Sequence, residues 1–154
     1  SSALEAASAF GTDPVEVASF SLPSNSGNEK AAMTLVTDVA AGLGLTGERL
    51  ERLKTAVSEA AMNAIEHGNE GDPRKPVDIT VLANTTKILV RIRDHGGGKE
   101  IPDMVTPNLE AKLAGQQSPR GWGLFLIQKM VDVVRTSTDG QHHIVELEMS
   151  RKED

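Results

Sequence analysis

Three side chains that could take part in phosphate chemistry recur at every fourth position of one segment. Glu59, Asn63 and His67 would therefore lie on one face of a helix. A carboxylate, a neutral amide and an imidazole placed in this way can orient a water or a hydroxyl beside a metal-bound phosphate. A histidine that ends a helix is more often structural, because it favours the helix C-terminus, and this is the interpretation preferred for His67.

Two glycine-rich segments follow this helix. Residues 94–98 read Asp-His-Gly-Gly-Gly after a strand-like run, and residues 120–124 read Arg-Gly-Trp-Gly-Leu at the opening of another helix. Asp94 has the parity of the apolar residues in its strand, so its carboxylate should face the core and need a hydrogen-bonding ligand. A lone Asp-x-Gly is more often a simple cap of a glycine turn. The three motifs in this order, with strands and helices interleaved, indicate an ATP site.

The composition is that of an ordinary globular domain. The 154 residues suffice for one hydrophobic core, with 38% hydrophobic and 25% charged residues. The net charge of −6 argues against a nucleic-acid partner, which would require clustered Lys and Arg. No apolar run is long enough to span a membrane and no secretory signal opens the chain, so no membrane partner is expected. The absence of cysteine excludes disulfides and suits a cytoplasmic protein.

Hydrophobic periodicity and turn residues predict elements in the order β-α-α-β-β-lid-α-β-β. This order indicates an α+β fold: a two-layer sandwich of one mixed, mostly antiparallel sheet with three helices on one face. We expect residues 1–13 to be a flexible N-terminal extension and residues 14–154 to form the domain. The predicted strands are 15–22, 77–83, 87–94, 133–138 and 142–150, and the predicted mobile lid is 101–119. The predicted helices run from a cap among Ser24, Asn25 and Ser26 to Leu43, from a Thr46 cap to a loop at Gly68, and from Gly123 to Asp132.

Several polar side chains outside these motifs are interpreted as solvated. On the helix they interrupt the apolar stripe, and on the strand the glutamates alternate with apolar residues. The histidines lie beside a turn and lack the ligand spacing of a zinc site. This set comprises Glu48, Arg49, Glu51, Arg52 and Glu66 on the second helix, and His142, His143, Glu146 and Glu148 on the last strand.

The motifs together resemble a known superfamily. Glu59-x-x-x-Asn63-Ala64-x-x-His67-Gly68 resembles the N-box of the GHKL, or histidine-kinase-like, ATPases. Asp94-x-Gly96-x-Gly98 is similar to their first glycine box, and Arg120-Gly121-Trp122-Gly123-Leu124 to their second. The amino-acid sequence of residues 57–68 is similar to that of the same segment in the bacterial anti-sigma-factor serine/threonine kinases. The resemblance covers residues 15–149 and implies a Bergerat-type ATP-binding fold.

The resemblance also implies a role for each motif residue and a cofactor, Mg-ATP. Glu59 is the expected general base, Asn63 the expected Mg²⁺ ligand, and Asp94 the expected acceptor of the adenine amino group. The other residues expected in the nucleotide site are Gly96 and Gly98, which line the pocket, Arg120, Gly121 and Gly123, which meet the phosphates, and Leu124.

The activity implied by the resemblance is phosphorylation of a serine or threonine on an anti-sigma-antagonist protein of the STAS type. Sequestration of a sigma factor, commonly by a kinase homodimer, is the second implied activity. Met33 stands where these kinases usually carry an arginine that contacts the partner, which bears on sigma binding more than on ATP binding. One alternative is a nucleotide-binding switch domain of a multidomain signalling protein. Another, the catalytic domain of a histidine kinase, is disfavoured because no phosphoacceptor helix pair precedes it.

Overall fold

The computed structural model describes residues 13–97 and 119–152, and the side chains of 119–122 are not described. The predicted N-terminal extension, nearly all of the predicted lid and Gly98 lie outside the described residues and stay predictions. Within the described part, no helix is long and apolar enough to cross a membrane.

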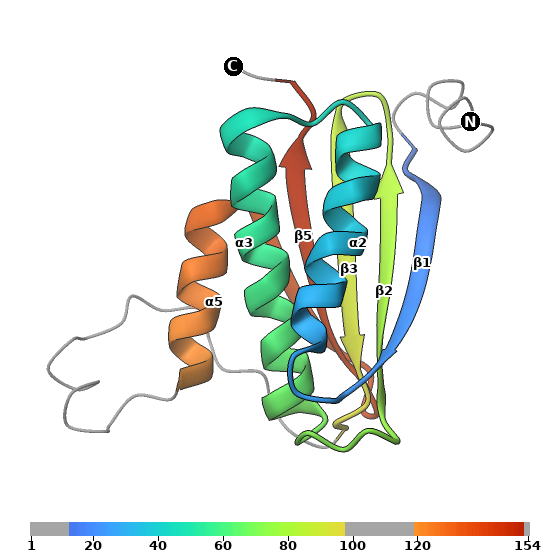
Figure 1. Ribbon diagram of the computed structural model, residues 1–154, viewed down its shortest axis with the longest axis vertical. Helices are drawn as coiled ribbons and strands as arrows, with labels where there is room; N and C mark the ends of the chain where they lie inside the picture. Colours follow the sequence, from blue (N-terminus) through green and yellow to red (C-terminus); the bar gives the residue numbers. More distant parts are fainter. Residues whose placement is uncertain (1–12, 98–118, 153–154) are drawn as a thin grey trace, which may run out of the picture.

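Helices and strands follow the predicted order (Figure 1). Most predicted boundaries are correct to within two residues, because strict alternation and turn residues define the strands. The strands are β1 (Val15–Pro23), β2 (Pro76–Ala83), β3 (Lys87–Asp94), β4 (Val133–Thr138) and β5 (His143–Ser150). The helices are α2 (Asn28–Gly42), α3 (Gly47–Asn63) with a π-helical turn η1 (Ala64–Gly68), and α5 (Pro119–Met130).

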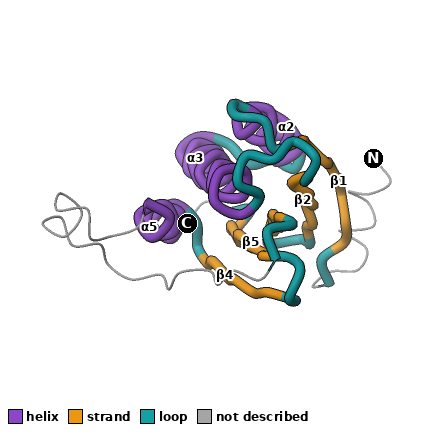
Figure 2. Tube along the Cα trace, turned by 90° about the horizontal axis from the view of Figure 1, so that it is seen from below, coloured by secondary structure: helices purple, strands orange, loops and turns teal. Residues whose placement is uncertain are grey.

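The described strands form one sheet in the order β1-β2-β3-β5-β4. Every pairing in this sheet is antiparallel, so the prediction of a mixed sheet is wrong in that detail. The helices α2, α3 and α5 lie together on one face of the sheet (Figures 1 and 2). The predicted α+β two-layer sandwich is confirmed.

The core lies between this helical layer and the sheet. Every second side chain of a strand faces the core, and in β2 half-buried and buried positions alternate strictly. The facing side of α3 is rich in alanine, which lets the helix lie close to the sheet. Cross-strand core pairs between β3 and β5 are Ile88–Met149, Val90–Leu147 and Ile92–Val145. The α3 residues buried against them include Leu53, Val57, Ala60 and Ala61.

The helix starts differ in part from the predictions. Thr46 is the N-cap of α3, as predicted. The N-cap of α2 is Gly27, whose φ of 99° is left-handed, so the prediction of a cap among residues 24–26 is wrong. Ser24 is instead buried, and its hydroxyl donates a hydrogen bond to the Lys75 carbonyl at 2.6 Å. The third helix begins at Pro119, four residues before the predicted start, in keeping with the preference of proline for the first helical turn.

Two charged residues assigned to solvated faces are buried. Arg49 is 8% exposed and donates to the Ser150 carbonyl at 3.1 Å and to Asp132 Oδ2 at 2.9 Å, which ties α3 to the end of β5. Glu148 is also 8% exposed. Its burial acts to raise its pKa, but hydrogen bonds from Arg135 and Lys87 outweigh that effect and lower the pKa. Alternation alone could not reveal these partners, since they come from distant parts of the chain.

Candidate functional site

The N-box segment changes its helical geometry directly after Asn63. The α-helix ends there, and the next turn is a π turn in which the Asn69 N–H donates to the Ala64 carbonyl at 2.8 Å. The four-residue spacing from Asn63 to His67 is therefore not α-helical. His67 is half-buried. It lies near enough to Glu59 for its charge to lower the pKa of that carboxylate. Wide turns of this kind occur often at functional sites.

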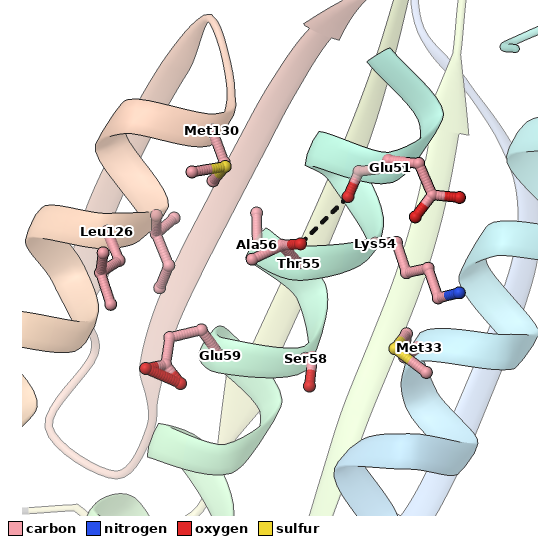
Figure 3. Close-up of a pocket in the computed structure, with 10 residues that line it drawn as sticks. Met33, Glu51, Lys54, Thr55, Ala56, Ser58, Glu59, Leu126 and Met130 are labelled. Carbon is pink, nitrogen blue, oxygen red and sulfur yellow. Dashed lines mark hydrogen bonds between the residues drawn. The ribbon is translucent and has the colours of Figure 1, made fainter. Parts of the chain in front are cut away.

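Glu59 is half-buried on α3 and opens on a groove between the helices. Burial and the negative charge of Glu66 raise the pKa of Glu59, while His67 lowers it to a smaller extent. The groove has a volume of about 350 Å³, and its walls include Met33 and Leu126. Figure 3 shows the carboxylate of Glu59 extending from α3 toward α5. A carboxylate with a raised pKa at the end of a groove suits a general base.

Asn63 lies one turn further along α3 and points into the protein. It is 5% exposed, and its Nδ2 has no hydrogen-bond partner among the described residues. A Cβ on Gly123 would lie 2.5 Å from this nitrogen, so glycine at 123 is what allows α5 to approach. The oxygen and nitrogen of an amide are interchangeable by a flip. Asn63 can thus offer either a donor or an oxygen ligand on this side.

Asp94, the last residue of β3, is 2% exposed, as its parity predicted. Its Oδ1 accepts a hydrogen bond from the Gly96 N–H at 2.9 Å and lies 3.1 Å from His143 Nδ1. The carboxylate also lies directly against Gly68, where a Cβ would overlap it. A Cβ on Gly96 would likewise overlap the carbonyl of Gly68. Gly68 and Gly96 must therefore be glycines, because the backbone and the Asp94 carboxylate pack too closely here to leave room for a Cβ.

His143 was predicted to lie on the surface, and this is wrong. The side chain is 1% exposed and contacts Asp94 across the β3–β5 pair. The signal was present in the sequence, since His143 has the same parity as the core residues Val145, Leu147 and Met149. His142 has the opposite parity, is half-buried, and contacts Asp139 instead.

Asn69 is a second residue of the site that the motifs did not reveal. Its side chain is fully buried and its Oδ1 accepts a hydrogen bond from the His95 N–H at 2.7 Å. Its Nδ2 donates to Ser24 Oγ and to the carbonyls of Lys75 and Pro76. This one amide therefore joins the π turn, the loop before β2 and the glycine turn after β3.

The structure brings three of the predicted nucleotide-site residues together. Asn63, Asp94 and Leu124 line one small cavity between α3, α5 and the sheet, with a volume of about 10 Å³. Glu59 lines the separate groove one helical turn away. The remaining predicted residues are Gly96 and Gly123, which are buried beside this cavity, Arg120 and Gly121, which begin α5 without described side-chain surroundings, and Gly98, which lies outside the described residues.

Comparison with protein families agrees with this geometry. Residues 22–149 match the family described as Histidine kinase-like ATPase domain. The chain therefore belongs to the histidine kinase-like ATPase domain family, and use of ATP follows from that membership.

Within this family, the chain is similar to bacterial anti-sigma factors. The anti-sigma F factor of Bacillus cytotoxicus is 44% identical over 108 residues, which span 70% of this chain and 73% of that protein. The anti-sigma F factor of Anoxybacillus flavithermus is 36% identical over 108 residues, again 70% and 73% of the two chains. The serine-protein kinase RsbW of Bacillus pumilus is 29% identical over 109 residues, or 68% and 67%. The predicted family is confirmed.

Proposed function

We propose that this protein is a Mg-ATP-dependent protein serine/threonine kinase that acts as an anti-sigma regulatory factor. Its family and the names of its relatives support this function. The observation that carries the proposal is the pairing of two sites on α3. A small, mostly apolar cavity includes the polar side chains of Asn63 and Asp94, and the preceding turn of the helix places Glu59, with its raised pKa, in an open groove.

The residues at the cavity have the chemistry that a nucleotide requires. Asp94, as a carboxylate, accepts the hydrogen bond of an adenine amino group. The amide of Asn63 would supply one oxygen to Mg²⁺, an ion that prefers oxygen ligands and keeps several waters. When bound, the metal neutralises charge that builds on the triphosphate. Because α5 begins at Pro119, the backbone N–H of Gly121 lies in its first turn, where phosphate binds well, and Arg120 beside it would add a bidentate contact.

Glu59 acts on the acceptor hydroxyl. As the hydroxyl oxygen bonds to the γ-phosphorus, the bond from that phosphorus to the β–γ bridging oxygen breaks and ADP leaves. The hydroxyl proton passes to the Glu59 carboxylate. Burial and Glu66 bring the pKa of this carboxylate closer to neutral pH, which favours proton uptake in the transition state.

An adenine ring can enter this cavity only if the elements around it move apart. About 10 Å³ is room for one water molecule, and an adenine ring is far larger. Leu124 of α5 lines the cavity and Gly123 packs against Asn63, whereas Asp94 is fixed by the sheet. We therefore infer that the first turns of α5 move away from α3 when the base enters.

We further propose that the acceptor protein approaches through the groove at Glu59. Met33 lies in this groove, at the position where related kinases carry a partner-binding arginine, so an apolar contact replaces an ionic one here. The relatives are named as anti-sigma F factors and as a serine-protein kinase. On that basis the partners are a STAS-type antagonist that receives the phosphate and a sigma factor. The kinase would be a homodimer in the cytoplasm.

Transfer of phosphate from radiolabelled ATP to candidate antagonists tests the function. Wild type should label a serine or threonine of its antagonist. Glu59→Ala should bind ATP as wild type does and lose transfer, while Glu48→Ala, an exposed change on the same helix, should keep both. Full transfer by Glu59→Ala would exclude it as the base. ATP binding by wild type without transfer to any antagonist would favour a nucleotide-binding switch domain.

A further inference from the structure

The core rows of β3 and β5 end in a buried polar pair. Three apolar cross-strand pairs precede it, and Asp94 opposite His143 continues the same face of the sheet. Asp94 is 2% and His143 is 1% exposed. Polar groups this deeply buried are costly unless they bond to each other, so the pair is held together by its surroundings.

The two side chains have complementary hydrogen-bonding chemistry. An ionised carboxylate only accepts hydrogen bonds, so the imidazole Nδ1, 3.1 Å from Asp94 Oδ1, must carry the proton. The Gly96 N–H donates to the same oxygen at 2.9 Å. Gly68 lies against the carboxylate, where even one methyl group would overlap it. The hydrogen bonds from Gly96 and His143, together with the close contact with Gly68, fix the orientation of this carboxylate.

We propose that His143 is a positioning residue of the nucleotide site: its Nδ1–H holds the Asp94 carboxylate in the orientation that recognises the exocyclic amino group of adenine. This inference rests on the proposed function and adds a determinant of base specificity to it. A recognition group held by a second layer of hydrogen bonds loses less entropy and discriminates better than a freely rotating one. His143 itself makes no contact with the base in this proposal.

The preference for ATP over inosine triphosphate separates positioning from a merely structural role. Inosine carries a carbonyl oxygen where adenine carries its amino group, so an oriented carboxylate should favour ATP. A structural defect would weaken binding of both nucleotides equally. Loss of orientation would weaken ATP binding and leave inosine triphosphate binding nearly unchanged, so the ratio of the two affinities is the informative quantity.

Isothermal titration of the whole chain with both nucleotides would provide this ratio for a small set of variants. In His143→Asn the amide nitrogen can occupy the place of Nδ1, and in His143→Gln it reaches the place of Nε2 instead. His143→Ala removes both donors. His142→Ala is the matched control, because that neighbouring histidine contacts Asp139 and the ring of His95 instead of the Asp94 carboxylate.

We expect His143→Ala and His143→Gln to bind ATP about tenfold more weakly, the loss that follows from one hydrogen bond to a charged group. Inosine triphosphate affinity should change by less than about twofold, a difference too small to reflect a lost hydrogen bond. His143→Asn and His142→Ala should keep the wild-type preference. If His143→Ala does not fold, the comparison of Asn with Gln decides.

Equal losses for both nucleotides, or no loss in His143→Gln, would overturn the positioning role and leave the kinase proposal standing. Wild-type protein that binds neither nucleotide would overturn the proposed function itself, and this inference with it.

Discussion

Replacing Gly68 by alanine tests whether the carboxylate of Asp94 is held in one place by its surroundings. Gly68 does not have a left-handed backbone, so the cost of the change is steric. The new Cβ would overlap the carboxylate and lie 2.9 Å from the Cβ of Asp94, closer than side chains pack. Asp94 is buried and bonded to Gly96 and His143, so it cannot move without breaking hydrogen bonds.

The size of the effect follows from these two costs. Overpacking a core costs about 1–3 kcal/mol. Loss of a hydrogen bond to a buried group costs a further amount of about 1–3 kcal/mol. We expect the free energy of unfolding to fall by about 3 kcal/mol, which in a domain of this size lowers the melting temperature by roughly 6–12 °C. ATP binding should weaken about tenfold or more, since the recognising carboxylate is displaced.

Scanning calorimetry and isothermal titration at one pH would measure both effects. Gly42→Ala is the matched control, because a Cβ at the end of α2 meets no atom within 4 Å and requires no left-handed backbone. Alanine there should be neutral or should stabilise by up to about 1 kcal/mol. If Gly68→Ala had the same melting temperature as the control and bound ATP with wild-type affinity, the Asp94 carboxylate would not be fixed in one orientation by its surroundings.

Four further substitutions test separate parts of the structure. Asn63→Ala should fold, because alanine is a good helix former. Its ATP affinity should no longer depend on Mg²⁺, and an unchanged Mg²⁺ dependence in isothermal titration would exclude Asn63 as a metal ligand. Asp94→Asn should weaken ATP binding about tenfold, since an amide presents a donor beside its acceptor; equal affinity would exclude the adenine contact. Glu59→Gln should raise the melting temperature at pH 7–8, because a raised pKa means that the ionised form costs stability above it. That gain should vanish below pH 4.5, the ordinary pKa of a glutamate, where both states are protonated, and a gain that is constant with pH would contradict the raised pKa. Arg49→Ala should lower the free energy of unfolding by about 1–3 kcal/mol, measured by urea titration, because its hydrogen bonds to Asp132 and Ser150 are lost; an unchanged midpoint would show that water replaces these bonds at no cost.

The sheet was predictable from sequence because its signals are local. Alternation in β2 and β3, a three-residue connection between them and the Asp-Gly turn before β5 define the hairpins without reference to the rest of the chain. The burial of Asp94 followed from the same rule, since parity along a strand decides which face a side chain occupies. The same parity, applied to His143, would have placed it in the core.

Other features depend on partners far along the chain and could not be predicted in this way. Arg49 is buried because Ser150 and Asp132 happen to lie beside it, at separations of 101 and 83 residues. Asn69 is buried because four segments meet around its amide. The π turn after Asn63 follows from hydrogen bonds to the i−5 carbonyl, and no residue pattern marks such a turn.

The uncompensated polar atom in the cavity connects the stability of the fold to its function. Asp94 and His143 offset the cost of their burial by bonding to each other, but Asn63 has a buried Nδ2 without a partner among the described residues. Among the described residues, buried atoms of Thr37 and Arg52 also lack a hydrogen bond, although Arg52 is ion-paired with Glu48, and neither residue lines the cavity. An unsatisfied group of this kind costs about 1–3 kcal/mol. Part of that cost is recovered when a ligand bonds to the amide, directly or after the amide flips. The free energy lost to the unsatisfied group in the free domain therefore adds to the affinity for the nucleotide. Asn63→Leu would remove the unsatisfied atom at similar volume. We therefore expect it to stabilise the domain without ligand, and to reduce the rise in melting temperature that ATP produces in the wild type.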